Sequence, residues 1–158
     1  MEARFDAYSS ELMNTFVRRF TAASQVVTDS TLPETVQELV RLRASQINGC
    51  GFCTDMHTKD ALAAGETQQR LNLVAAWRDA TVFSDAERAA LALAEEGTRI
   101  ADAHTGVSDD VWLAARKHFD DEQLAALITT IAAINAWNRL NVIVGTPAGS
   151  YQPAQHAS

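Results

Sequence analysis

The chain has 158 residues, enough for one domain with a sizeable hydrophobic core. Hydrophobic residues make up 47% of it and charged residues 21%, which is typical of an ordinary globular protein. The formal net charge of −7 argues against nucleic acid and anionic membranes as partners, because both repel an acidic surface.

The cellular location is expected to be the cytoplasm. The N-terminal stretch MEARFDAYSSELMNTF carries acidic residues and no continuous apolar core, so we do not expect a signal peptide. The most apolar stretch, LAALITTIAAINAW, is interrupted by threonine and asparagine, and we expect it to be too short and too polar to cross a bilayer, which takes about 20 residues. Cytoplasmic thiols stay reduced, so a close cysteine pair there points to catalysis or metal binding.

An all-α domain is predicted over residues 1–145. Only three prolines occur, and residues 34–146 contain none that would break a helix. No alternating run of β-branched residues flanks an Asn-Gly or Asp-Gly turn, so strand signals are weak. Residues 146–158 hold two prolines and no periodicity, and we expect an irregular tail that lies either on its own subunit or on a neighbouring one.

The first three helices are predicted in chain order. The first covers about residues 6–26. The second has Pro33 at its first helical position, where a missing N–H costs nothing, and it stops at Asn48-Gly49. The third runs from about Cys50 to Gly65, a residue suited to a C-terminal cap.

Further helices follow to give six to seven in total. One is predicted over residues 67–79. The next opens with Ser84 and Glu87, which have the spacing of a capping box. Another starts near Ser108, and the last has leucine and isoleucine at helical spacing and ends at Gly145.

Both cysteines lie in the stretch QINGCGFCTDMHTKDALAAG as a C-x-x-C pair. On a helix of about 100° per residue, His57 lies roughly 40° and Cys50 roughly 60° from Cys53, and Asp60 borders the same face. Two sulfurs and one imidazole therefore share one face. The group is interpreted as a redox dithiol, as part of a metal site, or as two core residues beside a chance histidine.

The redox interpretation has a chemical basis, because the thiolate is the reactive form of cysteine. Unpaired N–H groups in the first turn of a helix favour an anion, which points to Cys50 as the attacking residue. His57 can take the proton of Cys53, and we weight this argument more because the base also serves the leaving group. A sulfenic acid on one cysteine then condenses with the other to a disulfide.

The other two interpretations need more coincidence. The motif C-x-x-C-x-x-x-H offers three ligands where structural zinc needs four, and His104 or His118 would have to complete the set. We therefore expect no metal, and the dithiol chemistry needs no organic cofactor. Buried free cysteines are common, but chance seldom adds an aligned histidine. We expect His104 and His118 at the surface or at helix ends, and His156, in the tail, to be inert.

Glu38 is a candidate partner of His57. Within one straight helix, Glu38 and Cys53 would lie roughly 22 Å apart. A chain reversal at Asn48-Gly49 would bring Glu38 and His57 nearly level and give the order Glu38–His57–Cys53. Glu38 also lies opposite the apolar stripe of its helix, so the competing interpretation is a solvated glutamate paired with Arg41 at the i, i+3 spacing.

The pattern E-x11-C-G-F-C-x3-H, from Glu38 through Cys50 and Cys53 to His57, resembles the active-site signature of the alkylhydroperoxidase D (AhpD) type of the carboxymuconolactone decarboxylase superfamily. The segments FSDAERAALALAEEGTRI and IAAINAWNRLNVIV resemble downstream segments of its single-domain members. The resemblance covers most of the chain. It implies an all-helical fold that assembles into homo-oligomers, either trimers or hexamers.

The resemblance also implies residue roles. Cys53 matches the attacking cysteine, Cys50 the resolving one, His57 the proton relay and Glu38 the carboxylate that orients it. The implied substrate is an organic hydroperoxide, and the implied reductant is a dithiol or lipoyl-bearing partner. Phe52 departs from the better-characterised peroxidases, which carry a histidine directly before the second cysteine. Phenylalanine relays no proton, so peroxidase efficiency and the reductant stay open.

The function expected is therefore a thiol-dependent alkyl hydroperoxide reductase in antioxidant defence. One alternative is a lactone-processing or decarboxylating enzyme like the superfamily's other branch, which needs acid–base groups and no cysteine pair. The other is a non-catalytic redox-sensing oligomer whose disulfide changes its assembly.

Overall fold

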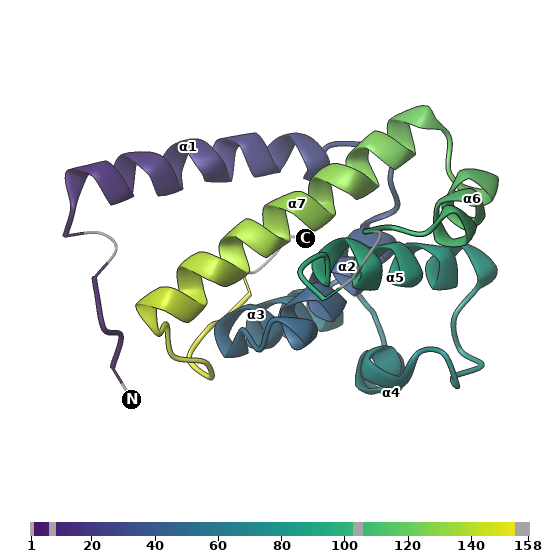
Figure 1. The fold of residues 1–158 in the computed structure, drawn as a ribbon. Helices are drawn as coiled ribbons and strands as arrows, with labels where there is room; N and C mark the ends of the chain where they lie inside the picture. The colour runs from purple at the N-terminus through teal and green to yellow at the C-terminus, as the bar shows by residue number, and fades with distance from the viewer. Residues whose placement is uncertain (1, 7–8, 103–105, 154–158) are drawn as a thin grey trace.

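The computed structural model describes residues 2–6, 9–102 and 106–153, and within them it is all-α, as predicted. The described residues form seven α-helices and one short 3-10 helix and contain no strand (Figure 1). The helices are α1 (Glu11–Thr28), α2 (Glu34–Ile47), α3 (Gly51–Ala63), α4 (Gln68–Leu73), α5 (Asp85–Thr98), α6 (Asp109–His118) and α7 (Asp121–Val144), with the 3-10 helix η1 (Val74–Ala76) after α4.

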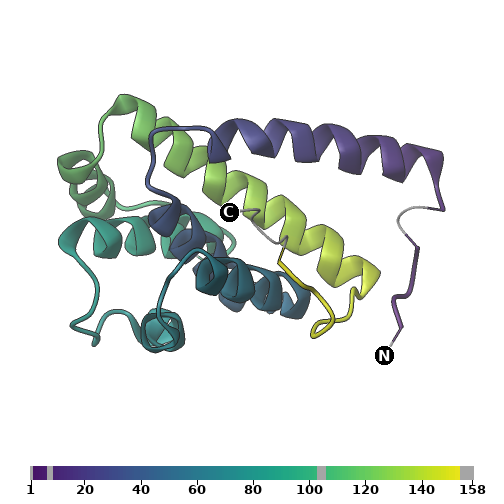
Figure 2. The same ribbon diagram turned by 180° about the vertical axis from the view of Figure 1, so that it is seen from behind.

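Helix α2 is the centre of the fold. It packs against α3, α5 and α7, and these three helices surround it in both views (Figures 1 and 2). Eight of its 14 residues are buried, including the polar residues Gln37, Glu38 and Ser45. A single apolar stripe is therefore an incomplete description of α2, because a helix covered from three directions also buries its polar face.

Helix α1 lies at the edge of the molecule, alongside α7 (Figures 1 and 2). Val27 is its one buried residue among those described. The helix begins at Glu11 because the Ser10 side chain accepts from the backbone N–H of Met13 and caps it. The predicted start at residue 6 is therefore wrong.

Two other predicted boundaries differ from the structure. Pro33 has an extended ψ of 133° and is the N-cap residue of α2, so the helix proper starts at Glu34. The helix predicted over residues 67–79 ends at Leu73 and continues as the 3-10 turn η1. The change of winding lets Val74 and Trp77 enter the same core cluster as residues of α2 and α5.

The remaining helix ends follow the predicted signals. Ser84 and Glu87 form a complete capping box at the start of α5. Ser108 caps α6 through its hydroxyl. Gly145 follows α7 in the left-handed conformation, with φ of 73°, which favours glycine. These signals are local, so they do not depend on how the helices pack.

Helix α7 is long and apolar enough to cross a membrane by length and composition alone. The expectation concerned only the stretch LAALITTIAAINAW, which α7 extends at both ends. One such helix is weak evidence for a membrane span, because core helices meet the same criterion. In the structure, α7 packs against α1, α2, α3 and α5.

The described part of the tail, residues 146–153, is irregular as predicted and folds back over α3 of its own chain. The Gly149 N–H donates to Asp55 at 2.9 Å, and Lys59 donates to the carbonyl of Tyr151 at 2.9 Å. The Tyr151 hydroxyl donates to Asp60 at 2.8 Å. This part of the tail therefore contacts α3 of its own chain.

Candidate active site

The site is built around the turn that connects α2 to α3. Gly49 adopts a φ of 66°, so the chain reverses directly after α2. The Asn48 amide donates to the side-chain oxygens of Asn135 at 2.9 Å and Asn138 at 2.8 Å. The turn is therefore anchored to α7, and it sets α2 and α3 side by side.

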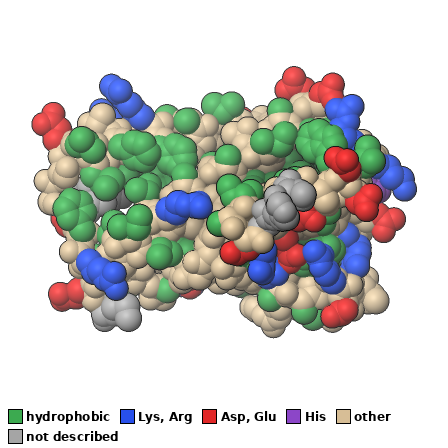
Figure 3. All heavy atoms as spheres, in the orientation of Figure 1, with side chains coloured by type: hydrophobic (Ala, Val, Ile, Leu, Met, Phe, Trp, Pro, Cys, Tyr) green, Lys and Arg blue, Asp and Glu red, His purple; other side chains and the backbone are tan. Residues whose placement is uncertain are grey.

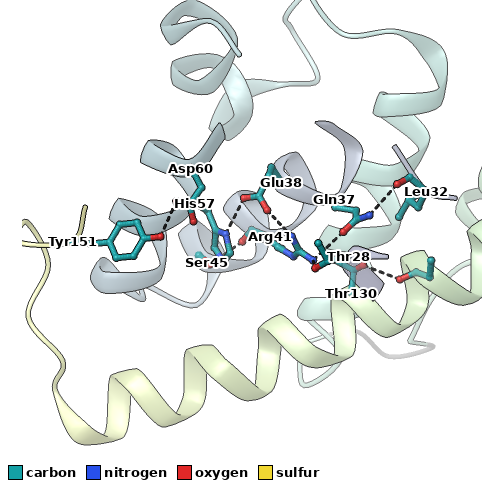
Figure 4. Close-up of polar contacts among 11 residues, drawn as sticks. Thr28, Leu32, Gln37, Glu38, Arg41, Ser45, His57, Asp60, Thr130 and Tyr151 are labelled. Carbon is teal, nitrogen blue, oxygen red and sulfur yellow. Dashed lines mark hydrogen bonds and ion pairs between the residues drawn. The ribbon is translucent and has the colours of Figure 1, made fainter. Parts of the chain in front are cut away.

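The reversal brings Glu38 and His57 into direct contact. The Nδ1 atom of His57 lies 2.9 Å from Oε2 of Glu38 (Figure 4). Both residues are buried, with 8% of Glu38 and 7% of His57 exposed. Arg41 also donates to Oε1 of Glu38, at 2.5 Å. The predicted Glu38–Arg41 pair is thus present, but the interpretation of Glu38 as a solvated residue is wrong.

The charge state of Glu38 determines what His57 can do. Burial raises the pKa of Glu38, but the hydrogen bond and charge of His57, together with Arg41, outweigh it and hold the pKa below its ordinary value. An ionised Glu38 accepts the N–H at Nδ1 of His57, which leaves the lone pair of Nε2 free to act as a base. Nε2 is buried and has no hydrogen-bond partner in the described part of the chain.

Arg41 connects this pair to the end of α1. Its guanidinium donates to Gln37 at 2.9 Å and to the hydroxyl of Thr28 at 3.4 Å. Gln37 in turn donates to the carbonyl of Leu32 at 2.9 Å. Figure 4 shows these side chains as one row leading away from His57. The row fixes the carboxylate of Glu38 from the side opposite the imidazole.

The two cysteines lie at the start of α3. Cys50 is the N-cap residue, and its sulfur accepts from the backbone N–H of Cys53 at 3.3 Å. The residues form a disulfide, with their Cα atoms 5.4 Å apart. Only 2% of Cys50 and 1% of Cys53 is exposed. One of the N–H groups at the start of α3, expected from the sequence to favour an anion, therefore binds the sulfur of Cys50.

A cavity of about 590 Å³ lies between α1, α3 and α7. Cys53 and His57 line it, but Cys50 does not. Most of the remaining wall is apolar and comes from α1 and α7, with Val17, Ile134, Trp137 and Leu140 among its residues. A small molecule in this cavity would therefore meet Cys53 before Cys50.

Other residues near the motif have separate partners. Asp60, expected to border the sulfur face, accepts the hydroxyl of Tyr151 in the tail. The ring of Phe52 packs edge-on against Tyr151, with centroids 6.3 Å apart. Phe52 also lines the cavity, so it contributes apolar surface where a histidine would contribute a proton.

The described residues contain no cluster of three His, Cys, Asp or Glu side chains arranged as metal ligands. His118 is the last residue of α6, as expected of a helix-end histidine. His104 and His156 lie outside the described residues.

Sequence reasoning missed Asn141. Its side-chain nitrogen lies 3.6 Å from the sulfur of Cys53, and it also lines the cavity. The available signal was the spacing of Asn135, Asn138 and Asn141, because asparagines three residues apart in an otherwise apolar helix share one face. Asn135 and Asn138 hold the turn, and Asn141 faces the sulfur of Cys53.

Comparisons with known proteins identify a family and a fold that this chain resembles. The model of the carboxymuconolactone decarboxylase family matches residues 11–96. The uncharacterized protein YdfG of Bacillus subtilis is 42% identical over 121 residues, covering 77% of this chain and 81% of that protein. The uncharacterized protein YnjA of Escherichia coli is 32% identical over 119 residues, covering 75% of this chain and 64% of that protein.

One solved structure is similar over nearly the whole chain. It is a protein of unknown function from Agrobacterium tumefaciens, described as a candidate antioxidant defence protein AhpD. The two chains are 35% identical, with a TM-score of 0.87, and the match covers 95% of this chain and 100% of the other. The similarity therefore covers the arrangement of nearly the whole chain.

Proposed function

The chain belongs to the carboxymuconolactone decarboxylase family and has an AhpD-like fold, and on that basis we propose that it is a thiol-dependent reductase of organic hydroperoxides. One observation carries the proposal. Cys53 and His57 line the same apolar cavity, and the Nδ1 atom of His57 is bound to the buried carboxylate of Glu38. That arrangement supplies a nucleophile, a base and a group that orients the base.

The first step is reduction of the O–O bond. Nε2 of His57 accepts the proton of the Cys53 thiol, directly or through one water, and the ion pair with Glu38 stabilises the imidazolium. The thiolate attacks the terminal oxygen of the hydroperoxide, an S–O bond forms and the O–O bond breaks. The departing alkoxide takes the proton from His57 and leaves as an alcohol. The two electrons come from sulfur, so Cys53 becomes a sulfenic acid.

The second step closes the disulfide. The Cys50 thiol releases its proton, the thiolate attacks the sulfenic sulfur, and the hydroxyl group takes up that proton and leaves as water. The N–H of Cys53 stabilises the Cys50 thiolate before attack, because hydrogen bonds to the charged form favour it. The 5.4 Å separation of the Cα atoms lies within the range that a disulfide requires.

The cycle ends with an external dithiol. It gives two electrons and two protons to the Cys50–Cys53 disulfide and leaves as a disulfide itself. A dithiol or lipoyl-bearing protein is the proposed reductant. Such recycling requires a reducing compartment, which supports a cytoplasmic location. The resident chemistry uses side chains alone, so the proposal includes no cofactor.

The shape of the cavity supports an organic substrate over hydrogen peroxide. A volume of about 590 Å³ is far larger than a peroxide molecule needs and lies within the range of small-molecule sites. Its apolar wall would bury an alkyl or aryl group beside Cys53. Phe52 extends that wall at the position where related peroxidases carry histidine.

We also propose that the chain is a homo-oligomer, either a trimer or a hexamer. Helix α1 leaves large apolar side chains exposed, with 78% of Leu12 and 48% of Phe16 accessible. Figure 3 shows hydrophobic side chains gathered over the half of the face that α1 and α7 occupy. Such surface usually marks an interaction site. Sedimentation equilibrium would give the mass, and a monomer at micromolar concentration would contradict this part.

Stopped-flow consumption of cumene hydroperoxide by the pre-reduced protein, with free thiols counted afterwards, tests the activity. We expect a fast loss of two thiols per chain, abolished in Cys53→Ser and slowed in His57→Ala. Thiols that react with the hydroperoxide no faster than free cysteine would contradict the proposed activity. Lactone turnover that survives loss of both cysteines would favour a decarboxylase-type enzyme. A redox-dependent change of mass without turnover would favour a redox sensor.

A further inference from the structure

Asn141 occupies a polar position in an apolar wall. It lies in the last turns of α7, and its side-chain nitrogen is 3.6 Å from the sulfur of Cys53 and 3.0 Å from the carbonyl of Trp137. A primary amide has two N–H groups, so both contacts can form at once. The contact with its own helix fixes the side chain, and the second N–H is directed at the sulfur.

The other asparagines of the same face have structural partners. Asn135 accepts from Asn48 and donates to Thr98, and Asn138 accepts from Asn48 and donates to Ser45. The side chain of Asn141 has no such role in the described part of the chain, where its hydrogen bonds go to Cys53 and to the carbonyl of Trp137 in its own helix. Leucine would suit the apolar wall and the helix better, because asparagine has the lower helix propensity. Packing therefore does not account for an asparagine here.

The sulfur of Cys53 needs such a donor. Burial disfavours the charged form of a thiol, and Cys53 is 1% exposed. The backbone N–H at the start of α3 binds the sulfur of Cys50 instead. His57 can take the proton of Cys53, but the anion that remains requires its own hydrogen bond in the cavity.

We propose that Asn141 is a further catalytic residue, whose amide donates to the sulfur of Cys53 and stabilises the attacking thiolate. The catalytic role of Asn141 rests on the proposed function, whereas its contact with the sulfur of Cys53 does not. It also gives each sulfur a separate donor, the backbone N–H of Cys53 for Cys50 and the Asn141 amide for Cys53. Because Cys53 faces the cavity and has its own donor, its thiolate is the one stabilised for attack on a substrate there.

The test titrates Cys53 without any substrate. In the Cys50→Ser background Cys53 is the only cysteine, and its thiolate is followed by ultraviolet absorbance against pH. We expect Asn141→Leu, which removes the donor at similar size, to raise the thiol pKa by about one unit, as loss of a hydrogen bond to a charged group does. Asn141→Asp keeps the shape, replaces the donor by a negative charge, and raises the pKa further. Asn141→Ala, which removes the donor without adding a charge, serves as the second variant if Asn141→Leu folds poorly.

Leu140→Val is the matched control, because Leu140 lines the same cavity and offers no donor. We expect it to leave the thiol pKa unchanged. Equal thiol pKa values in the parent protein and in a folded variant that lacks the donor without adding a charge would overturn the assignment. The titration does not depend on turnover. A shifted thiol pKa in a protein that does not reduce hydroperoxide would refute only the proposed function. An unshifted thiol pKa in a protein that does reduce it would refute only the role of Asn141.

Discussion

The Nδ1 atom of His57 lies 2.9 Å from Oε2 of Glu38, although 19 positions separate the two residues along the chain. The bond crosses from α3 to α2, and it exists because the chain reverses at Asn48 and Gly49. The reversal brings two distant positions of the sequence together, as the proposed base and its orienting carboxylate. The turn is therefore as important to the site as the side chains themselves.

Glu38→Gln should slow oxidation of Cys53 by an organic hydroperoxide by roughly 10²-fold, a typical contribution of acid–base groups. Glutamine fills the same space but carries no charge, so it no longer stabilises the imidazolium of His57. Rapid-mixing kinetics on reduced protein would measure the change. Glu34→Gln, on the exposed first turn of the same helix, is the matched control and should retain the parental rate. Equal rates for the two variants would contradict a relay through Glu38.

Asn48→Ala should lower the free energy of unfolding by about 2–4 kcal/mol. The change removes the donor shared by the buried oxygens of Asn135 and Asn138, and each unsatisfied buried acceptor costs about 1–3 kcal/mol. Urea denaturation gives the difference. The control Asn72→Ala removes an exposed amide on α4 and should change stability by less than about 0.5 kcal/mol. A loss at Asn48 no larger than that at Asn72 would show that the asparagines do not anchor the turn.

The limits of sequence reasoning follow from which interactions are local. The capping box at Ser84, the cap at Ser108 and the glycine after α7 were predictable, because each signal spans a few residues. The pairing of Glu38 with His57 was anticipated from the length of two helices and the turn between them. The burial of Glu38 was not, because it depends on helices that are distant in sequence covering α2 from three directions.

The contact of Asn141 with Cys53 was also beyond the sequence. It joins residues 88 positions apart and depends on how α7 crosses α3. The start of α1 and the end of α4 were misjudged for a related reason. Helical periodicity continues past both points, whereas the observed ends depend on the Ser10 cap and on the core position of Trp77.

Ala133→Leu should reduce kcat/KM for cumene hydroperoxide by roughly tenfold and leave that for hydrogen peroxide nearly unchanged. Ala133 lines the cavity, so a larger side chain there removes space for an organic group while Cys53 stays accessible to a small oxidant. Steady-state assays with both oxidants measure the ratio. Ala132→Leu, on the exposed side of α7, is the control. A parallel loss for both oxidants in Ala133→Leu would show that the cavity does not select the substrate.

Tyr151 should titrate near pH 12. Burial raises the pKa of its hydroxyl, and the hydrogen bond and charge of Asp60 and the charge of Glu38 add to the effect, giving a pKa of about 12 against an ordinary value of 10.0. The folded state favours the neutral phenol. The contact therefore stabilises the folded state fully below about pH 10, and this contribution is lost as the pH rises through about 12.

Phenolate absorbance in a Tyr8→Phe variant would isolate Tyr151, since the chain has two tyrosines. Asp60→Asn removes the charged acceptor and should move the midpoint toward 10.0. Circular dichroism across the same pH range establishes that the protein remains folded. A midpoint near 10 in the folded protein would contradict docking of the tail on α3.

In the proposed function, Cys53 and not Cys50 attacks the hydroperoxide. Trapping with dimedone tests it directly, because this reagent binds sulfenic acid. Reduced Cys50→Ser and Cys53→Ser proteins would each receive one equivalent of cumene hydroperoxide and dimedone, followed by peptide mass spectrometry. We expect an adduct on Cys53 in the Cys50→Ser protein and none in the Cys53→Ser protein. An adduct on Cys50 in the Cys53→Ser protein, or no adduct in either, would contradict it.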